Sequence, residues 1–308
     1  MLTSGWSPDV LLSLLEYSNI VTVFSVLFSK ERSKIILCEQ NNPRQYLSFA
    51  KFRHLKFFFM KLAYNKADRI IVSSEGVGNV LHEDLLIPKE KIVVIYNPIE
   101  LPEIFKLRNQ DVTGFPETNG RMVVISAGRL TKQKNFELLL KSFKLVRKNL
   151  NVLLIILGVG ELERKLRMLA EELMLANDVY FAGFQHNPFS WIVKADVFVL
   201  TSDWEGFGNV IIESMACGVP VVATNCPFGP GEIIENGRNG FLAPVGDPQM
   251  LADSIAFLLN NKSVSDEIVK SAFISVQRFD SASIVAEYEK VLRECIANGD
   301  ESNALATN

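Results

Sequence analysis

The chain has 308 residues, of which 48% are hydrophobic and 22% charged, an ordinary globular composition with enough apolar material for about two domains. The formal net charge of −3 and the isoelectric point near 5.8 argue against a dedicated nucleic-acid-binding protein. The four cysteines form no Cys-x-x-Cys pair and there are only three histidines, which disfavours a disulfide framework or a zinc site and fits a reducing cytoplasm.

The first part of the chain, residues 1–98, shows short apolar runs separated by longer segments. These runs predict strands at residues 9–15, 34–38, 69–73 and 91–95. The apolar stretch 10–28 also has an interpretation as a membrane span. Glu16 and Asn19 interrupt this stretch and no basic region precedes it, which favours a buried strand followed by a helix at residues 19–28.

A linker is predicted at residues 99–120, which are rich in proline, glycine and asparagine. Pro98 ends the first part, because proline disfavours helix before it and cannot continue a strand ladder. After the linker, β-branched runs alternate with amphipathic segments. The predicted strands are 122–127, 152–157, 179–182, 197–201, 219–223 and 241–243, and the predicted helices are 136–148, 161–175, 189–195, 210–217 and 248–259. This alternation implies parallel βαβ units, which bind ligands outside the carboxyl ends of their strands.

The loop directly after the predicted strand at 122–127 carries several cations. Arg129, Lys132 and Lys134 follow Gly128 and precede a helix. Backbone N–H groups and the dipole at a helix N-terminus add to this side-chain charge, so the loop is a candidate site for anions. Arginine can hold a phosphate through two N–H groups, whereas lysine supplies a compact charge. A solvated surface loop is the alternative interpretation.

A second candidate element holds two glutamates eight residues apart, Glu205 and Glu213, on either side of a Gly-x-Gly turn that opens a helix. Glycine lets backbone amides approach a ligand closely, so the amides of Phe207, Gly208 and Asn209 are expected to face a phosphate or a sugar. Glu213 lies about one turn inside the helix and can accept hydrogen bonds from ribose hydroxyls. Surface solvation is the usual role of a lone glutamate, but it explains the turn and the two acids together poorly.

These motifs belong to a longer pattern that resembles family 4 of the retaining glycosyltransferases, which have the two-Rossmann-lobe architecture called GT-B. The matching stretches over residues 126–247 are SAGRLTKQKN, ILGVGELERKL, VYFAGF, ADVFVLTSDWEGFGNVIIESMACGVPVVATNCPFGPGEII and NGRNGFLAPVGD, and earlier matches are ADRIIVSSEGV and IYNP. The resemblance implies an α/β fold with two parallel sheets. Residues 1–98 would form an acceptor-side lobe, completed by a C-terminal helix at 278–298, and residues 121–277 a nucleotide-sugar donor-binding lobe.

The resemblance also assigns roles to single residues. Arg129 and Lys134 match the pair that binds the donor diphosphate, and Glu205 matches the acid that contacts the donor sugar, so these three are the expected catalytic residues. The expected donor-binding residues are Gly128, Phe184 beside the base, Phe207, Gly208, Asn209 and Glu213 at the ribose. Gly158 and Gly160 match a turn bordering the site, where a structural role and ligand contact are both open. Neither a metal nor another cofactor is expected.

The function implied is transfer of a hexose or N-acetylhexosamine, with retention, from a nucleoside-diphosphate sugar to a glycan or lipid-linked acceptor in cell-surface polysaccharide biosynthesis. Family members begin with a strand, a glycine-rich loop and a helix, and this first lobe shows no counterpart, so it is interpreted as truncated. Two alternatives therefore stay open: a nucleotide-sugar-binding remnant without turnover, and a sugar-nucleotide epimerase on the same architecture. No nucleic-acid partner is expected.

The first lobe contains further candidates for contact with acceptor or donor. Glu39, Asn42 and Arg44 follow a predicted strand, and ordinary loop polarity is the alternative interpretation. Residues 44–69 hold seven Lys or Arg and one acid among many aromatic side chains. This pattern predicts either a helix lying on an anionic membrane surface or a lobe helix with its apolar side in the core. The first interpretation implies a cytoplasmic protein that is peripheral on the inner face of the plasma membrane.

Overall fold

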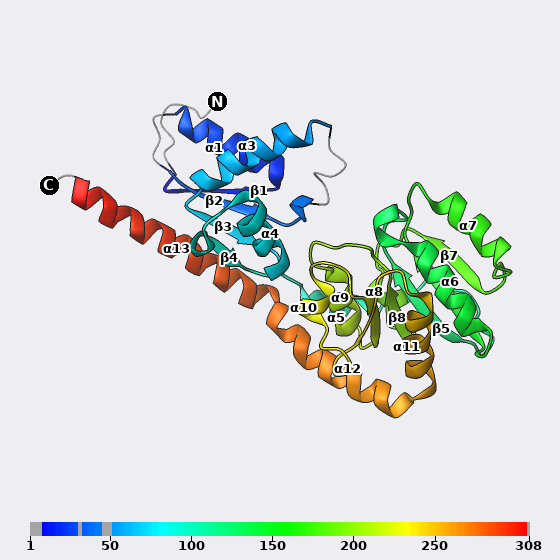
Figure 1. The fold of residues 1–308 in the computed structure, drawn as a ribbon. Helices are drawn as coiled ribbons and strands as arrows, with labels where there is room; N and C mark the ends of the chain where they lie inside the picture. Colours follow the sequence, from blue (N-terminus) through cyan, green and yellow to red (C-terminus); the bar gives the residue numbers. More distant parts are fainter. Residues whose placement is uncertain (1–7, 30–32, 45–50, 307–308) are drawn as a thin grey trace. The chain divides into compact units, whose positions relative to one another are not determined.

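The chain forms two compact units in the computed structural model (Figure 1). The structure describes residues 8–29, 33–44 and 51–306, with side chains described up to residue 297. The beginning of the chain and residues 45–50 of the basic segment lie outside the described residues, together with the expectations placed on them. Unit 1 comprises Met1–Pro98 and Ala282–Asn308, and unit 2 comprises Ile99–Ser281.

Unit 1 is built on a four-stranded parallel sheet with the strand order β1-β2-β3-β4. Its strands are β1 (Val10–Leu14), β2 (Lys34–Glu39), β3 (Arg69–Val72) and β4 (Ile92–Val94). Successive side chains of a strand point to opposite faces. Accordingly, Ile35 and Leu37 belong to one hydrophobic cluster and Ile36 and Cys38 to another. The sheet is therefore buried on both faces.

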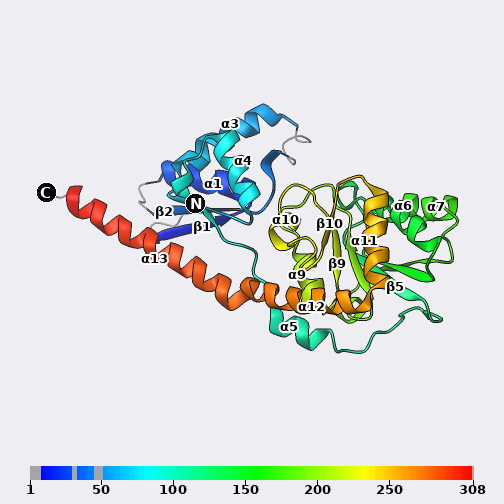
Figure 2. The ribbon, with the colours of Figure 1, turned by 60° about the horizontal axis from the view of Figure 1, so that its bottom comes forward.

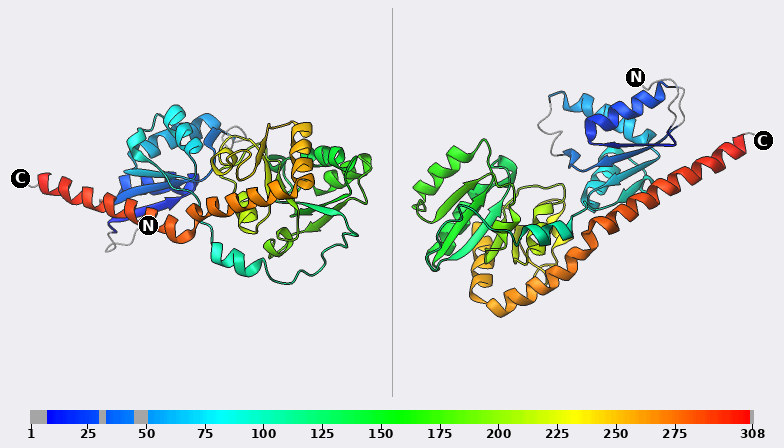
Figure 3. Two further views of the ribbon diagram at one scale, coloured as in Figure 1. Left: turned by 90° about the horizontal axis from the view of Figure 1, so that it is seen from below. Right: turned by 180° about the vertical axis from the view of Figure 1, so that it is seen from behind.

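Helices cover the two faces of this sheet (Figures 1 and 3). On one face lie α1 (Glu16–Leu27), α3 (Arg53–Lys66) and α4 (Glu75–Leu85). The 3₁₀ turn η1 (Lys89–Lys91) directly precedes β4. On the other face α13 (Ser281–Ala306) packs through Ile284, Val291 and Cys295. The apolar stretch 10–28 thus divides into β1 and α1. Within the residues described, no helix combines the length and the apolarity that crossing a membrane requires.

Unit 2 is built on a six-stranded parallel sheet with the order β10-β9-β8-β5-β6-β7. Its strands are β5 (Met122–Ala127), β6 (Val152–Leu157), β7 (Val179–Gly183), β8 (Val197–Leu200), β9 (Val221–Thr224) and β10 (Phe241–Ala243). The sheet grows from β5 outward to β7, and then from β8 outward to β10 on the other side. This is the doubly wound order of a Rossmann-like fold, with its reversal between β5 and β8.

Helices pack on both sides of the second sheet (Figure 2). Side chains of α6 (Phe136–Arg147), α7 (Glu163–Glu172) and α11 (Pro248–Asn260) share one hydrophobic cluster with the strands. A second group surrounds α9 (Asn209–Ala216), which is contacted by α5 (Leu101–Leu107), α8 (Phe189–Ile192), α10 (Pro230–Ile233) and α12 (Lys262–Val276). The 3₁₀ turns of this unit are η2 (Lys132–Lys134) and η3 (Gln277–Phe279).

Residues 99–120, interpreted from the sequence as a linker, differ from that expectation because they belong to unit 2 and contain α5. Leu101 and Ile104 are buried, and Arg108 donates a hydrogen bond from Nη1 to the carbonyl of Ala216 over 2.7 Å. This segment is therefore packed against the end of α9. Of the turn-forming residues that suggested a linker, Pro102 lies in the first turn of α5 and the others come after this helix.

Candidate functional site

Two loops of unit 2 lie side by side at the point where the strand order reverses. They follow β5 and β8, which pair in parallel register at Val124 and Val197. We call residues 128–135 the cation loop and residues 201–208 the acid loop. The connections from β5 and β8 run to opposite sides of the sheet, which leaves a crevice at the carboxyl ends of these strands. Parallel sheets of this kind bind their ligands in that crevice.

Hydrogen bonds join the cation loop to the acid loop. They are Asp203 N to Gln133 O (2.9 Å), Gln133 Nε2 to Trp204 O (3.0 Å), Asn135 Nδ2 to Asp203 Oδ1 (2.7 Å) and Thr201 Oγ1 to Lys134 O (2.9 Å). Asn135 has a left-handed backbone with φ 43° and caps α6, accepting a hydrogen bond from Leu138 N over 3.2 Å. Asparagine tolerates this conformation better than most residues. The two loops are thereby held as one rigid element.

Lys134 and Glu205 form an ion pair between the two loops. Lys134 Nζ lies 2.6 Å from Glu205 Oε1, and the two side chains are 17% and 8% exposed. The Ser202 hydroxyl donates to the same carboxylate oxygen over 2.5 Å. A carboxylate this deeply buried needs such partners, because desolvating a charge without them is costly. The pair therefore fixes both side chains at the mouth of the crevice.

Glu213 lies near the same lysine, one turn inside α9. Burial raises the pKa of the Glu213 carboxyl above its ordinary value, and the charge of Lys134 acts in the opposite direction. Lys134 is thus the cation shared by the two acids of the Glu-x7-Glu element. Because Lys134 belongs to η2 and Glu213 to α9, two elements far apart in the sequence, only the fold brings them together.

Gly158 and Gly160 allow the turn after β6 to approach the cation loop. A Cβ atom at Gly158, whose φ is +127°, would overlap the carbonyl oxygen of Gly128. A Cβ at Gly160 would overlap the backbone of Leu130. The amide of Leu130 donates to the carbonyl of Val159 over 3.0 Å. The structure therefore shows a packing reason for both glycines, the close approach of two backbones.

Arg129 and Phe184 line a pocket beside the cation loop. Its volume is about 260 Å³, and its lining residues are Ala127, Gly128, Arg129, Leu157, Gly158, Val159, Phe184, Gln185 and Pro188. The Phe184 ring is 65% exposed and stands edge-on to His186, with the ring centroids 5.1 Å apart. Arg129 is exposed and makes no ion pair with any described residue. Its guanidinium is therefore available to a ligand of this pocket.

The turn that opens α9 presents its backbone rather than its side chains. The Phe207 side chain is only 2% exposed, so it points into the core. Gly208 has a left-handed backbone with φ 103° and stands at the N-cap of α9, and Asn209 is the first helical residue. An N-terminal amide group has no partner within its own helix. The predicted use of backbone amides here agrees with this geometry but stays a prediction.

The three candidates of unit 1 are engaged inside that unit. The Glu39 carboxylate is wholly buried, accepts a hydrogen bond from the Tyr64 hydroxyl over 2.6 Å, and has its pKa raised to about 7 by burial. Asn42 Oδ1 accepts from the amide of Arg44 over 3.0 Å. Arg44 itself forms ion pairs with Glu83 and Asp84. The structure thus gives each of the three an internal role, and contact with a substrate stays a prediction.

Ser202 and Asn135 are parts of this site that the sequence analysis did not single out. Ser202 donates to Glu205, and Asn135 joins the two loops. An asparagine directly before the apolar run of α6 is a recognisable N-cap signal and could have drawn attention to Asn135. Nothing in the sequence pattern marks Ser202. Among the residues that the structure describes, no group of three or more His, Cys, Asp or Glu is placed to hold a metal ion.

The fold and the site together define a class of protein. A doubly wound parallel sheet with cations and a helix N-terminus at its reversal point is the arrangement of a Rossmann-like nucleotide-binding lobe. The sequence profile described as "Glycosyl transferases group 1" matches residues 108–274, and the one described as "Glycosyltransferase Family 4" matches residues 8–102. The chain belongs to the group 1 glycosyl transferases.

Individual relatives agree with this assignment. The chain is 28% identical over 275 residues to the N-acetylgalactosamine-N,N'-diacetylbacillosaminyl-diphospho-undecaprenol 4-alpha-N-acetylgalactosaminyltransferase of Campylobacter jejuni. The aligned region covers 89% of this chain and 73% of that protein. It is 31% identical to the capsular polysaccharide biosynthesis glycosyltransferase CapM of Staphylococcus aureus, over 77% of this chain and 64% of CapM. Across four such relatives the chain spans between 58% and 73% of their length.

A solved structure shares the fold. The crystal structure of HepE from Anabaena in complex with UDP-glucose superposes with a TM-score of 0.79 at 25% identity, covering 93% of this chain and 79% of HepE. The expected α/β fold of two Rossmann-like lobes with parallel sheets, matching the GT-B glycosyltransferases, is confirmed.

Proposed function

We propose that this chain transfers a hexose or N-acetylhexosamine, with retention, from a nucleoside-diphosphate sugar to a glycan or lipid-linked acceptor in cell-surface polysaccharide biosynthesis. Membership of the glycosyl transferase family supports the reaction class. The names of the relatives support the pathway class, because one acts on a diphospho-undecaprenol-linked sugar and another builds capsular polysaccharide. UDP-glucose in HepE supports a nucleotide sugar as donor.

The observation that carries the proposal is the position of Lys134. It pairs with Glu205 over 2.6 Å and its charge acts on Glu213, while Arg129 is exposed in the same cation loop. In the proposed complex the donor diphosphate lies between these two cations and the N-terminus of α9. Glu205 then contacts the donor sugar and Glu213 the ribose.

The proposed chemistry is electrostatic. As the bond between the sugar and the phosphate breaks, negative charge grows on the leaving diphosphate, and fixed cations and amides stabilise this charge without reorganising. Arg129, Lys134 and the amides near Gly208 are the groups placed to do so. The leaving phosphate accepts the proton of the acceptor hydroxyl, which attacks the same face of the sugar. This scheme needs no side-chain nucleophile and no metal ion.

The acceptor side of the proposal includes an anionic membrane surface. α3 turns Met60, Ala63 and Tyr64 into the core of unit 1. On its outer side Leu55 and Phe58 are 55% and 59% exposed and stand among basic residues. Apolar side chains surrounded by cations are the chemistry that an anionic lipid interface attracts. A chain working on a lipid-linked acceptor would be held there at the inner face of the plasma membrane.

A panel of UDP-, GDP- and dTDP-sugars, with product analysis, tests the proposal. Transfer or hydrolysis of one donor with release of the nucleoside diphosphate, and a product of the same anomeric configuration, is the expected result. Arg129→Ala should lose most of this turnover while keeping its stability, because its side chain is exposed and unpaired in the described structure. Binding without turnover would leave only a sugar-nucleotide-binding role, and formation of an epimer would replace the proposal.

A further inference from the structure

Phe279 packs against the acid loop from a separate segment of unit 2. It ends η3, which follows α12 in the chain. The Phe279 side chain is 0% exposed, and its ring stands edge-on to Phe207 with centroids 5.5 Å apart and planes at 70°. Such edge-to-face pairs stabilise beyond the area they bury. The side chain that precedes Gly208 is thus held by a residue that belongs to neither loop.

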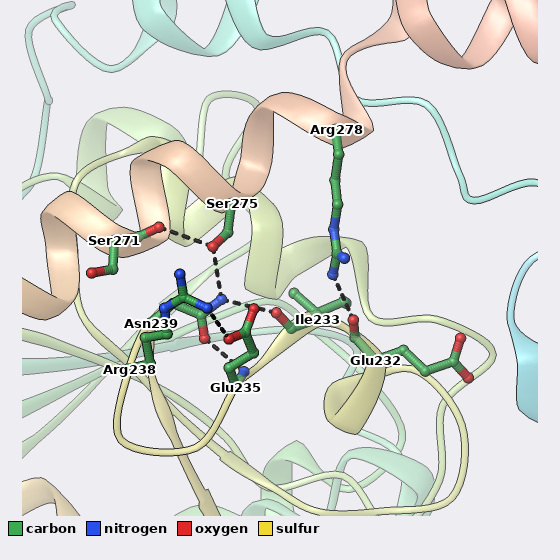
Figure 4. Close-up of polar contacts among 8 residues, drawn as sticks. All are labelled: Glu232, Ile233, Glu235, Arg238, Asn239, Ser271, Ser275 and Arg278. Atoms are coloured by element: carbon green, nitrogen blue, oxygen red, sulfur yellow. Dashed lines mark hydrogen bonds and ion pairs between the residues drawn. The ribbon is translucent and has the colours of Figure 1, made fainter.

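Polar contacts hold the same segment against α10 (Figure 4). Arg278 donates from Nη2 to the carbonyl of Glu232 over 2.7 Å. Its guanidinium carbon also lies 4.6 Å from the centroid of the Phe279 ring. Figure 4 shows the Arg278 side chain extended from the end of its helix toward the Glu232 backbone. Arg278 therefore links α10 with the residue that holds Phe207.

A second set of contacts links the C-terminal end of α10, next to Glu232, to α12 (Figure 4). Asn239, which is 1% exposed, donates from Nδ2 to the carbonyl of Ile233 and to Ser275 Oγ, both over 3.1 Å. Ser275 Oγ in turn donates to the carbonyl of Ser271 over 2.9 Å. A buried polar network with satisfied partners resists displacement, since breaking it leaves polar groups unpaired. α10 and α12 therefore form one frame.

This frame meets the acid loop at the backbone of Phe207. Gly229, the N-cap of α10, has φ 94°, and a Cβ atom there would overlap the Phe207 carbonyl oxygen. Phe207 is thus enclosed on its backbone side by α10 and on its ring side by Phe279. Gly208, the next residue, has no side chain that could anchor the turn, and glycine has the greatest backbone freedom of all residue types. The direction of the following amides consequently depends on Phe207.

We propose that Phe279 is a positioning residue for the donor-binding turn: by fixing the Phe207 ring, it fixes the direction of the Gly208 and Asn209 amides. This inference rests on the proposed donor site. In this proposal Phe279 acts on the turn through Phe207 rather than by contacting the substrate. A residue with a purely structural role in the core would lower stability when shortened but would leave the turn and the turnover of the folded protein unchanged.

The substitution Phe279→Leu tests the proposal, with Phe143→Leu as its matched control. Phe143 is also 0% exposed in unit 2, but it lies on α6 and belongs to a hydrophobic cluster that does not include Phe207 or Phe279. Amide hydrogen exchange of residues 203–213 is measured in the ligand-free proteins. We expect at least about fivefold faster exchange there in Phe279→Leu and unchanged exchange in Phe143→Leu. Arg278→Gln, at an exposed position, gives a smaller rise in the same segment and replaces Phe279→Leu if that variant does not fold.

Turnover of the nucleotide sugar that the wild type uses in the UDP-, GDP- and dTDP-sugar panel supplies the second readout. Phe279→Leu should lower kcat about tenfold while the KM for this nucleotide sugar changes by less than about threefold, because misplaced backbone N–H groups weaken the transition state most. Phe143→Leu should match the wild type once corrected for folded protein. Equal exchange of residues 203–213 in the two leucine variants overturns the inference. If the wild type neither binds nor turns over any nucleotide sugar, the proposed function fails, and hydrogen exchange alone still decides the positioning role.

Discussion

Replacing Lys134 by alanine distinguishes a ligand for the donor diphosphate from a structural counter-ion. The Lys134 ammonium lies 2.6 Å from Glu205, and both side chains are largely buried. Alanine leaves the Glu205 carboxylate with the Ser202 hydroxyl as its hydrogen-bond donor. Leaving a buried charged group incompletely paired should lower the free energy of unfolding of unit 2 by about 2 kcal/mol.

The double variant Lys134→Ala/Glu205→Gln separates this stability loss from the loss of chemistry. Without a buried unpaired charge, about half of the lost stability should return. Turnover should not return, because the Lys134 cation is still missing from the place where charge grows on the leaving phosphate. Each variant should lose about 2–4 kcal/mol of transition-state stabilisation, which is roughly 30-fold to 1,000-fold in rate.

Urea unfolding and nucleotide-sugar turnover of the same preparations measure the two effects. Lys165→Ala is the matched control, because Lys165 pairs with Glu137 over 2.7 Å on the surface and is 65% exposed. The control should change the free energy of unfolding by less than about 0.5 kcal/mol and leave turnover intact. Recovery of both stability and turnover in the double variant would refute the reasoning, since Lys134 would then act only as a counter-ion.

Three further predictions concern other parts of the chain. Burial raises the pKa of Glu39 from 4.5 to about 7. The stability that this raised pKa contributes is therefore fully present below about pH 4.5 and is lost as the pH rises through 7. Between pH 5 and pH 8 the wild type should therefore lose roughly 2 kcal/mol of unfolding free energy relative to Glu39→Gln, and parallel pH curves would count against this. Gly158→Ala should lower the free energy of unfolding of unit 2 by more than about 3 kcal/mol, because its Cβ overlaps Gly128. The control Gly246→Ala, whose Cβ meets no atom within 4 Å, should lower it by about 1 kcal/mol. Equal losses in the two variants would contradict the packing argument. Leu55→Asp/Phe58→Asp should abolish flotation with liposomes rich in anionic lipid. The control Ile274→Asp, at a position 75% exposed in unit 2, should float like the wild type. A wild type that stays in solution would remove the membrane proposal.

Much of the fold follows from the sequence because the strands of unit 2 are β-branched runs with polar or turn-forming neighbours. β5, β6 and β10 occupy the predicted residues, and the parallel arrangement follows from the alternation with helices. The predicted strand at 219–223 differs at its beginning, since β9 starts at Val221. Pro220 cannot donate to the ladder, although its carbonyl still accepts from Phe198 over 2.9 Å.

Other elements could not be obtained from local pattern. α4 contains Gly76 and Gly78, which lower helix propensity, and its formation depends on packing and on the Ser74 cap. In the candidate site, the sequence analysis identified the two cations and two acids from motifs and resemblance. The pairing of Lys134 with Glu205, and the hydrogen bond from Ser202, depend on two loops that only the strand order brings together.

The central claim is that one diphosphate binds between the cation loop and the N-terminus of α9. Its most direct test is a crystal structure of the chain with the nucleotide sugar that raises the melting temperature most in a thermal-shift screen. We expect the diphosphate oxygens within hydrogen-bond distance of Arg129 and Lys134, with the ribose at Glu213. A nucleotide sugar bound elsewhere on the protein, with both cations still free of phosphate, would contradict the account.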